Sequence, residues 1–381
     1  MRNMIEYVKW RGDISFKAYP LCEADYLVFA QLSYLPFDNI LDDSFAPTKT
    51  LGDAAKKVVE KIEAGGGKYV ISLAENLLLA REIARSPRFC DLPVCGYVDI
   101  FNRQKQEQFS AVTFLIPDHE DPGNSGCVVA FRGTDSTIIG WKEDFNMAFS
   151  RAIPAQLDAT KYLERVHAEY PLQRLFVCGH SKGGNLAMYS AAFCDIDTQD
   201  AIAAVRSLDG PGFSDDILMK DGFRRILDRS ETVVPSSSLV GILFEHAEAF
   251  TVVKSYSTSA PFQHNPFTWE IERGGYVGVE KITASSVYID ETLRKWLISM
   301  PFEMREKLVS GVFAIVDATG VDDIRKLFTR KNFMIMLSEL KKLDDETRKV
   351  LKQALMLFNK ASGNNLIRFI EKLVRAETAR K

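Results

Sequence analysis

Ser181 lies in the hexapeptide GHSKGG at residues 179–184, which fits the pattern G-x-S-x-G. The apolar run LFVCG precedes this serine and the run NLAMYSAAF, with helical spacing, follows it, so the sequence predicts a sharp turn from a strand into a helix. Such a turn lifts the serine hydroxyl off a sheet, and only glycine fits at the close approaches beside it. Free amides at the start of the helix stabilise a developing oxyanion. We therefore predict that Ser181 is a nucleophile for acyl transfer.

A second motif, FRGTD at residues 131–135, ends the apolar run CVVAF. It brings the hydroxyl and the amide of Thr134 to the end of a strand, next to the expected position of Ser181. We expect Thr134 and the backbone amide of Lys182 to donate hydrogen bonds to the oxyanion. The side chain of Lys182 is expected to have no part in this, because only its amide is needed. A capped turn with an Arg–Asp surface pair explains the FRGTD motif equally well.

A serine nucleophile needs a general base, and the chain has five histidines. His264 follows the last expected strand and a short loop, and it comes after Ser181 in the chain, as the base of an α/β-hydrolase does. His246 is the second candidate, although it follows an apolar helical turn that is typical of a buried histidine. The others are expected to be two solvated surface residues and one that braces the turn: His119, His167 and His180.

The runs VVAFRGTDSTIIGWKEDF and VCGHSKGGNLA, followed by a late histidine, resemble the class 3 (fungal-type) lipase branch of the α/β-hydrolases. The runs EYVKWRGDISF, LSYLPF, LDGPGF and QHNPFTW look more like a poorly characterised bacterial family related to these lipases. The first resemblance covers about residues 90–270, and the second covers most of the chain up to about residue 290. The lipase resemblance implies a lipase-like or esterase-like serine hydrolase that acts on a lipid or small-molecule ester. Acyl transfer of this kind needs no cofactor.

The acid that would orient the base is the hardest residue to assign. The resemblance implies a carboxylate after the strand TVVP, but residues 235–238 read Pro-Ser-Ser-Ser. Asp209, at the end of the preceding run AIAAVRSL, is our candidate, since a carboxylate there can accept the Nδ1 proton of His264. Asp209 has an alternative role as the cap of the Gly-Pro-Gly turn that follows it. Glu245 is a second candidate acid, and a Ser–His dyad bridged by a serine or water is a third arrangement.

The elements that position these residues follow from the hydrophobic periodicity. Strand and helix patterns alternate from about residue 126 to 257, which predicts a mainly parallel sheet with helices on both faces, the α/β-hydrolase fold. An antiparallel hairpin is expected before this region, and helical patterns are expected at both ends of the chain. We expect residues 1–90 to form a helical N-terminal lead-in packed on the core. Residues 91–280 are expected to form the hydrolase core, and residues 281–381 a C-terminal helical region.

Composition excludes several classes of protein. The 381 residues are 46% hydrophobic, and 48 Lys/Arg against 51 Asp/Glu give a net charge of −3, which excludes a polycationic nucleic-acid binder. No apolar run approaches the roughly 18–20 residues that cross a bilayer, and the N-terminal run lacks a signal-peptide core. The six cysteines predict reduced thiols, and Cys90 with Cys95 lacks partners at zinc spacing, so we expect no metal site. We expect a cytoplasmic protein.

Residues 330–381 contain 13 Lys/Arg and 6 Asp/Glu, together with the apolar clusters MIML at 334–337 and LMLF at 355–358. A solvated helical bundle explains this pattern, and peripheral contact with a membrane or an acidic partner is the alternative. Two other functions also stay open at this point. One is a catalytically inactive hydrolase-fold binding or scaffold protein, and the other is a thioesterase, acyltransferase or peptidase that uses the same residues. The sequence leaves the oligomeric state open.

Overall fold

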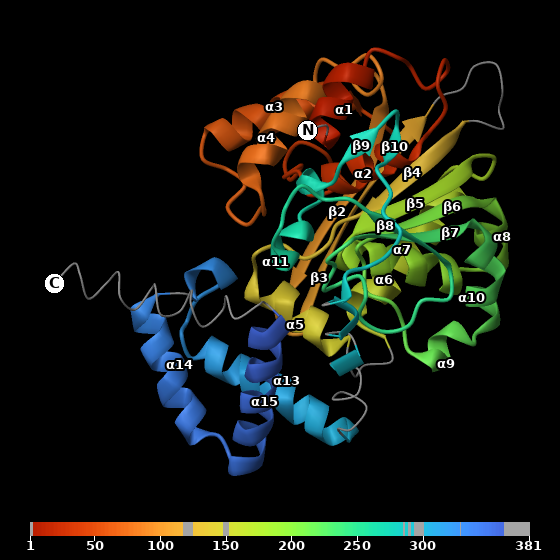
Figure 1. Cartoon of the computed structure of the whole chain (residues 1–381). Coiled ribbons are helices and arrows are strands. Elements are labelled where there is room, and N and C mark those ends of the chain that lie inside the picture. Colours follow the sequence, from red (N-terminus) through yellow and green to blue (C-terminus); the bar gives the residue numbers. More distant parts are fainter. Residues whose placement is uncertain are drawn as a thin grey trace.

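A single eight-stranded sheet forms the centre of the computed structural model, with helices on both of its faces (Figure 1). The structure describes residues 3–116, 125–147, 152–284, 286–288, 291–292, 301–327 and 329–361. The strands follow one another across the sheet in chain order: β1 runs Lys49–Thr50, β2 Pro93–Asn102, β3 Glu107–Ile116, β4 Gly126–Phe131, β5 Arg174–His180, β6 Ile202–Leu208, β7 Ser230–Pro235 and β8 Ala249–Val253.

Strands β1 to β4 pair antiparallel, and strands β4 to β8 pair parallel. Every residue of β4 is buried, as expected for a continuous apolar run in the middle of a covered sheet. Parallel neighbours end at the same edge of the sheet, so β4, β5 and β6 deliver the residues that follow them to one place. The predicted hairpin and the predicted α/β-hydrolase fold are confirmed.

One face of the sheet is covered by the helices that connect the parallel strands. These are α6 (Pro154–Glu169), α7 (Lys182–Phe193), α8 (Ile196–Ala201), α9 (Asp215–Leu218) and α10 (Asp221–Ile226). Helix α7 lies between α6, α10 and the sheet, and it is buried along almost its whole length. A helix that is covered on all sides carries apolar or small residues all round, which explains the composition of NLAMYSAAF.

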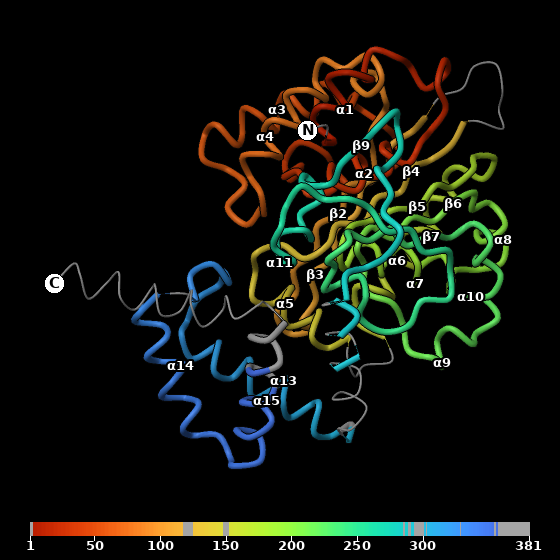
Figure 2. The backbone as a smooth tube through the Cα atoms, in the orientation of Figure 1, coloured from red at the N-terminus to blue at the C-terminus, as the bar shows by residue number. Residues whose placement is uncertain are grey.

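The N-terminal helices cover the opposite face (Figure 2). They are α1 (Met4–Arg11), α2 (Glu23–Leu32), α3 (Leu51–Glu63) and α4 (Leu73–Ile83). Helix α2 packs on β4, β5 and β6, and all of its residues after Glu23 are buried. These helices therefore share a hydrophobic core with the sheet. The domain boundaries at 90/91 and 280/281 stay predictions.

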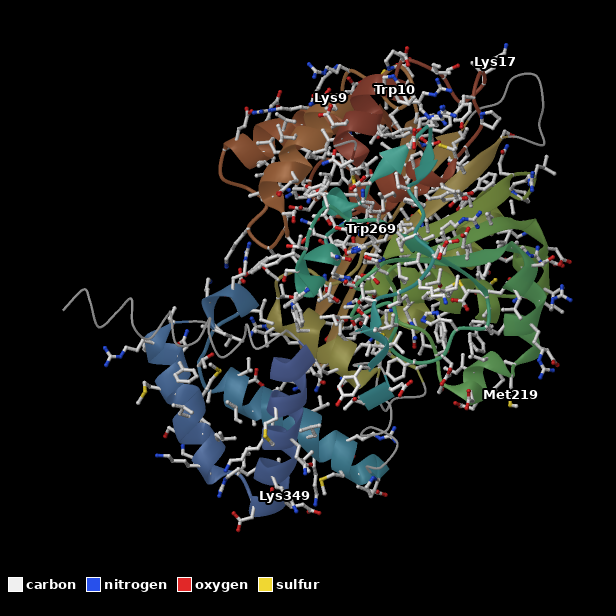
Figure 3. The ribbon with its side chains drawn as sticks, in the orientation of Figure 1. Lys9, Trp10, Lys17, Met219, Trp269 and Lys349 are labelled. Atoms are coloured by element: carbon white, nitrogen blue, oxygen red, sulfur yellow. The ribbon has the colours of Figure 1, made fainter. Side chains whose placement is uncertain are left out.

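A late segment of the chain returns to these N-terminal helices. It contains α11 (Ala260–Gln263), the 3₁₀ turn η2 (Pro266–Thr268), and the short strands β9 (Ile271–Glu272) and β10 (Gly275–Tyr276). The side-chain amide of Asn3 donates to the carbonyl of Phe267 over 3.0 Å, and the backbone amide of Ala24 donates to the carbonyl of Gly274 over 2.9 Å. Trp269 lies in the interior between these parts (Figure 3). The segment is thus bound to the N-terminal helices at two points that follow His264 in the chain.

The C-terminal helices form a separate bundle beside α5 (Ile138–Asn146) (Figure 1). The bundle contains α13 (Phe302–Asp317), the 3₁₀ turn η3 (Ile324–Lys326), α14 (Arg330–Lys342) and α15 (Asp345–Ala361). Phe313 of α13 stacks edge-on against Phe145 of α5, with ring centroids 5.7 Å apart. Met336 packs inside the bundle, whereas Met334 is exposed.

Part of the basic segment, residues 362–381, and the side chains of most of the LMLF cluster lie outside the described residues. Membrane contact by the C-terminal helices therefore stays a prediction. In the part of the chain that the structure describes, no helix has both the length and the apolar character to cross a membrane.

The spacing of apolar residues in DDILMKDGFRRILD, residues 215–228, predicts one helix, but the structure has two. Lys220 has an extended backbone and separates α9 from α10. Gly222 of α10 lies so close to α7 that a Cβ atom on it would be 2.1 Å from the carbonyl oxygen of Ala192. Tight packing of α10 on α7 therefore overrides the local helical pattern.

Asp25 and Arg88 form an ion pair that is completely buried, with 2.5 Å between Nη2 and the carboxylate. Arg88 also donates to the carbonyls of Ile14 and Tyr19, and Tyr7 donates to Asp25. These bonds join residues of the N-terminal region that are up to 74 positions apart in the chain.

We expect Arg88→Met to lower the free energy of unfolding by about 3–5 kcal/mol, because it leaves the Asp25 carboxylate buried without its partner. Denaturant unfolding followed by circular dichroism measures this change. Arg81→Met is the matched control, since Arg81 pairs with Glu63 at the surface and its loss costs about 0–1 kcal/mol. Equal midpoints for the two variants would contradict the assignment of Arg88.

Candidate active site

Ser181 occupies the turn between β5 and α7 in a strained backbone conformation, with φ 59° and ψ −130°. A non-glycine residue in this region costs about 1–3 kcal/mol and persists only where its surroundings hold it there. A Cβ atom on Gly179 would lie 2.1 Å from the carbonyl oxygen of Gly183, and one on Gly183 would lie 2.2 Å from the carbonyl oxygen of Phe131 in β4. The glycines of GHSKGG are thus required by close backbone approaches.

Ser181, His264 and Asp209 form one hydrogen-bonded row. The Nε2 atom of His264 is 3.0 Å from the Oγ atom of Ser181, and its Nδ1 atom is 2.6 Å from Oδ2 of Asp209. Because an ionised carboxylate only accepts, the Nδ1–H group donates to Asp209, and Nε2 is left to accept a proton from the serine hydroxyl. The three residues named from the sequence thus meet in one place.

The Asp209 side chain is fully buried, and its second carboxylate oxygen is held by two donors. The hydroxyl of Ser238 donates to Oδ1 over 2.5 Å, and the amide of Gly241 donates to the same atom over 3.0 Å. Ser238 belongs to the Pro-Ser-Ser-Ser segment in which the lipase resemblance implied an acid. Sequence reasoning missed both donors, although the three serines at that position were the available signal.

His180 supports the segment that carries His264. The Nε2–H group of His180 donates to the backbone carbonyl of His264 over 2.8 Å, and the two rings are tilted by 36° with centroids 4.7 Å apart. Its Nδ1 atom accepts from the hydroxyl of Tyr34 over 3.1 Å. Burial, together with the nearby His264, lowers the pKa of His180 well below its ordinary value, so its ring is neutral. His180 therefore braces the His264 segment as well as the turn.

The alternative residues lie elsewhere. His246 binds Glu248 through Nδ1 over 2.8 Å. The backbone of Glu245 pairs with Phe213, and Asp209 is the carboxylate that faces His264. His167 lies on α6. His119 lies outside the described residues.

Thr134 follows the end of β4 and lies beside the turn between β5 and α7 that carries Ser181, which we call the nucleophile elbow. A Cβ atom on Gly133 would lie 3.2 Å from the Cβ atom of Ser181, so this loop is in contact with the serine. The hydroxyl of Thr134 donates to Oδ2 of Asp144 over 2.5 Å. The amide of Lys182 is the first of α7, a position at which a helix amide has no acceptor within the helix. Thr134 and the amide of Lys182 are thus close to Ser181. Since the Thr134 hydroxyl donates its one proton to Asp144, its backbone amide is the group left to donate to an oxyanion.

The alternative explanation of FRGTD was a capped turn with an Arg–Asp surface pair, and the structure has the capped turn but not the surface pair. Asp135 caps the turn by accepting from the amide of Thr137 over 2.8 Å. Arg132, however, is buried and binds Asp99 of β2 over 2.8 Å, whereas Asp135 is 3.8 Å away. The motif is therefore part of the interior and not a surface ion pair.

The side chain of Lys182 differs most from expectation. It is fully buried, and its Nζ atom is 2.8 Å from Oε2 of Glu143 and donates to the carbonyl of Gln108 over 2.8 Å. Asp144 lies 3.9 Å from the same ammonium group. Burial raises the pKa of Asp144 to about 6, although Lys182 and the Thr134 hydroxyl oppose this shift. The sequence did not predict this buried ion pair, and the expectation that the Lys182 side chain has no part in binding the oxyanion stays a prediction.

Among the described residues, no group of three or more His, Cys, Asp or Glu side chains is arranged to hold a metal ion. All six cysteines are free thiols, four of them buried.

A family model described as Mbeg1-like matches residues 83–314, which is more than half of the chain. This match confirms the lipase-like resemblance inferred from the motifs. A search of curated proteins finds no significant match.

Several solved structures are similar to this chain at low sequence identity. A mutant form of MDLA from Penicillium cyclopium is 14% identical over 61% of this chain and 79% of that one, with a TM-score of 0.36. The Rhizomucor miehei lipase in complex with its propeptide is 14% identical over 64% and 75%, with a TM-score of 0.35. The Lip2 lipase from Yarrowia lipolytica is 13% identical over 64% and 84%, with a TM-score of 0.32.

The close approach at the elbow gives a stability prediction. We expect Gly183→Ala to lower the free energy of unfolding by about 1–3 kcal/mol, because its methyl group would displace the β4 backbone. Gly275→Ala is the control, since the nearest atom to its Cβ would be 3.8 Å away, and it should stabilise the protein by about 0.4–1 kcal/mol. Denaturant unfolding measures both. If Gly183→Ala unfolded at the same denaturant concentration as the wild type, the close approach of Gly183 to Phe131 would not be required.

Proposed function

Because the chain belongs to the Mbeg1-like family and its elbow serine is hydrogen-bonded to a histidine, we propose that it is a serine hydrolase that cleaves carboxylic esters. The observation that carries the proposal is the strained Ser181, with its Oγ atom 3.0 Å from Nε2 of His264. Strain of this kind is retained at sites where it serves a function.

The proposed reaction has two halves. Ser181 Oγ attacks the ester carbonyl carbon while His264 Nε2 takes the hydroxyl proton, and Asp209 stabilises the imidazolium that forms. The tetrahedral oxyanion accepts hydrogen bonds from the backbone amides of Lys182 and Thr134. Its collapse breaks the bond to the alkoxy group, which leaves as an alcohol with the proton from His264. Water then attacks the acyl-enzyme by the same steps, and the carboxylic acid leaves.

A lipid or small-molecule ester is the proposed substrate. The lipase resemblance of the motifs and the match to the Mbeg1-like family support this class. We further propose a cytoplasmic location, on the basis of the free cysteine thiols.

The inactive scaffold is the second candidate, and it was favoured by the absence of a carboxylate after TVVP. The hydrogen bonds of Asp209 to His264 and Ser238 weaken that argument, since a carboxylate reaches the base from the neighbouring strand. A fluorophosphonate probe separates the two candidates. It is expected to label the wild type but not Ser181→Ala, and an unlabelled wild type would favour the scaffold.

We expect Ser181→Ala and His264→Ala each to lower turnover of p-nitrophenyl acyl esters by at least ~10³, and the double variant to be hardly worse. A chain-length series of esters and matched thioesters would identify the acyl group and the leaving group. His246→Ala is the control and should keep near wild-type turnover. If His246→Ala abolished turnover while His264→Ala kept it, the assignment of the base would be wrong.

The oxyanion assignment gives a graded prediction. Thr134→Val keeps the side-chain shape but removes the hydroxyl that binds Asp144 and thereby orients the Thr134 amide, so kcat should fall by ~10²–10³. Thr134→Ser restores a hydroxyl and should recover most of this loss. Steady-state kinetics and thermal unfolding of both variants provide the measurement. A Thr134→Val enzyme with wild-type kcat would exclude the hydroxyl from the reaction.

A further inference from the structure

The residue that follows the candidate nucleophile has a buried ammonium group. Lys182 follows Ser181 in the chain, and its side chain is fully buried among elements that surround the elbow. Its Nζ atom donates to the backbone carbonyl of Gln108 in β3 and to Glu143 in α5, each over 2.8 Å. The side-chain oxygen of Gln108 lies 3.3 Å from the same atom. Three acceptors therefore surround the three protons of this ammonium group.

Glu143 is equally buried, and both of its oxygens are bound. Oε2 accepts from Lys182 and from the backbone amide of Gln108 over 3.1 Å, while Oε1 accepts from the amide of Ala155 in α6 over 3.1 Å. Because most of these partners are backbone groups, the ion pair fixes α5 to β3, α6 and α7 at once. Helix α5 has no freedom to turn about its axis while these bonds are present.

The same helix holds Thr134. Asp144, the neighbour of Glu143, accepts the hydroxyl of Thr134, and its other oxygen is buried 3.9 Å from the Lys182 ammonium group. Gly140, one turn earlier, is so close that a Cβ atom on it would lie 2.9 Å from Cγ2 of Thr134. The direction of the Thr134 side chain is therefore set by the position of α5.

We propose that Lys182 and Glu143 are positioning residues, whose ion pair fixes α5 and thereby aligns Thr134 beside Ser181 for the oxyanion. This inference rests on the proposed function and extends it. The two residues act through Asp144 and Thr134 and do not touch the substrate. Their loss should therefore lower kcat and leave KM nearly unchanged.

Stability alone is a weak reason for this pair. Buried ion pairs contribute little net free energy, because desolvation of the two charges offsets their attraction, and apolar residues of similar size often replace them without loss. A pair that links the nucleophile turn to the helix beside Thr134 gives defined geometry instead. This distinction can be tested by removing both charges together.

The test compares Lys182→Met, Glu143→Gln and the double variant in the full chain, with p-nitrophenyl acyl esters as substrates. Each single change leaves one buried group without its partner, so both single variants should unfold at lower temperature. The double variant should regain most of the thermal stability, yet its kcat should stay ~10²-fold below the wild-type value with KM within about twofold. The surface pair Arg81 and Glu63, changed to Met and Gln, is the matched control and should alter neither value.

A double-mutant cycle with Thr134 gives the second readout. If the pair acts through Thr134, Glu143→Gln should cause little further loss of kcat in a Thr134→Val background. The inference would be overturned if Glu143→Gln lowered kcat as much in the Thr134→Val background as in the wild type. It would also be overturned if the double variant of Lys182→Met and Glu143→Gln were stable and had the wild-type kcat. A wild type that turns over none of the esters would overturn the proposed function, and the inference with it. An active wild type with an unaffected Glu143→Gln variant would overturn the inference alone.

Discussion

The approach of β4 to the start of α7 is the constraint on which the candidate site depends. The carbonyl oxygen of Phe131 lies where a side chain on Gly183 would be, so the strand and the helix meet backbone to backbone. This contact brings Gly133 and Thr134 against Ser181, and it holds the serine in a conformation that an isolated chain would leave. Because β4, β5 and β6 are parallel neighbours, the same edge also receives Asp209.

Buried carboxylates join distant parts of the chain throughout the molecule. Asp25 binds Arg88, Glu143 binds Lys182 and Asp209 binds His264, and each pair spans at least thirty-nine residues. Each carboxylate also accepts from at least one further hydroxyl or amide, which satisfies lone pairs that burial would otherwise leave empty. Specific geometry, more than net stability, follows from such arrangements.

Local patterns predicted the features that local physics controls. The apolar run of β5, the helical spacing of α7 and the glycines of GHSKGG were sufficient to predict the elbow, and chain order favoured His264 as the base. Chain order did not separate Asp209 from Glu245 as the acid, because both lie between Ser181 and His264. The partners of Lys182 and the donors to Asp209 come from distant parts of the chain. Gln108 is 74 residues from Lys182, and Gly241 is 32 residues from Asp209. Pairs at such separations leave no periodic signal in the sequence. The break between α9 and α10 was missed for the same reason, since packing of Gly222 on α7 causes it.

The family match begins at residue 83, yet much of the core lies before it. A fragment that started there would lose α2, and the faces of β4, β5 and β6 that α2 covers would be bare hydrocarbon facing water. Such a surface promotes self-association, so the fragment should collect in inclusion bodies. It would also lack the Ala24 amide that donates to Gly274, and the His264 segment would lose an anchor. Homologues trimmed to the family boundary for expression should therefore fail even where every catalytic candidate is retained.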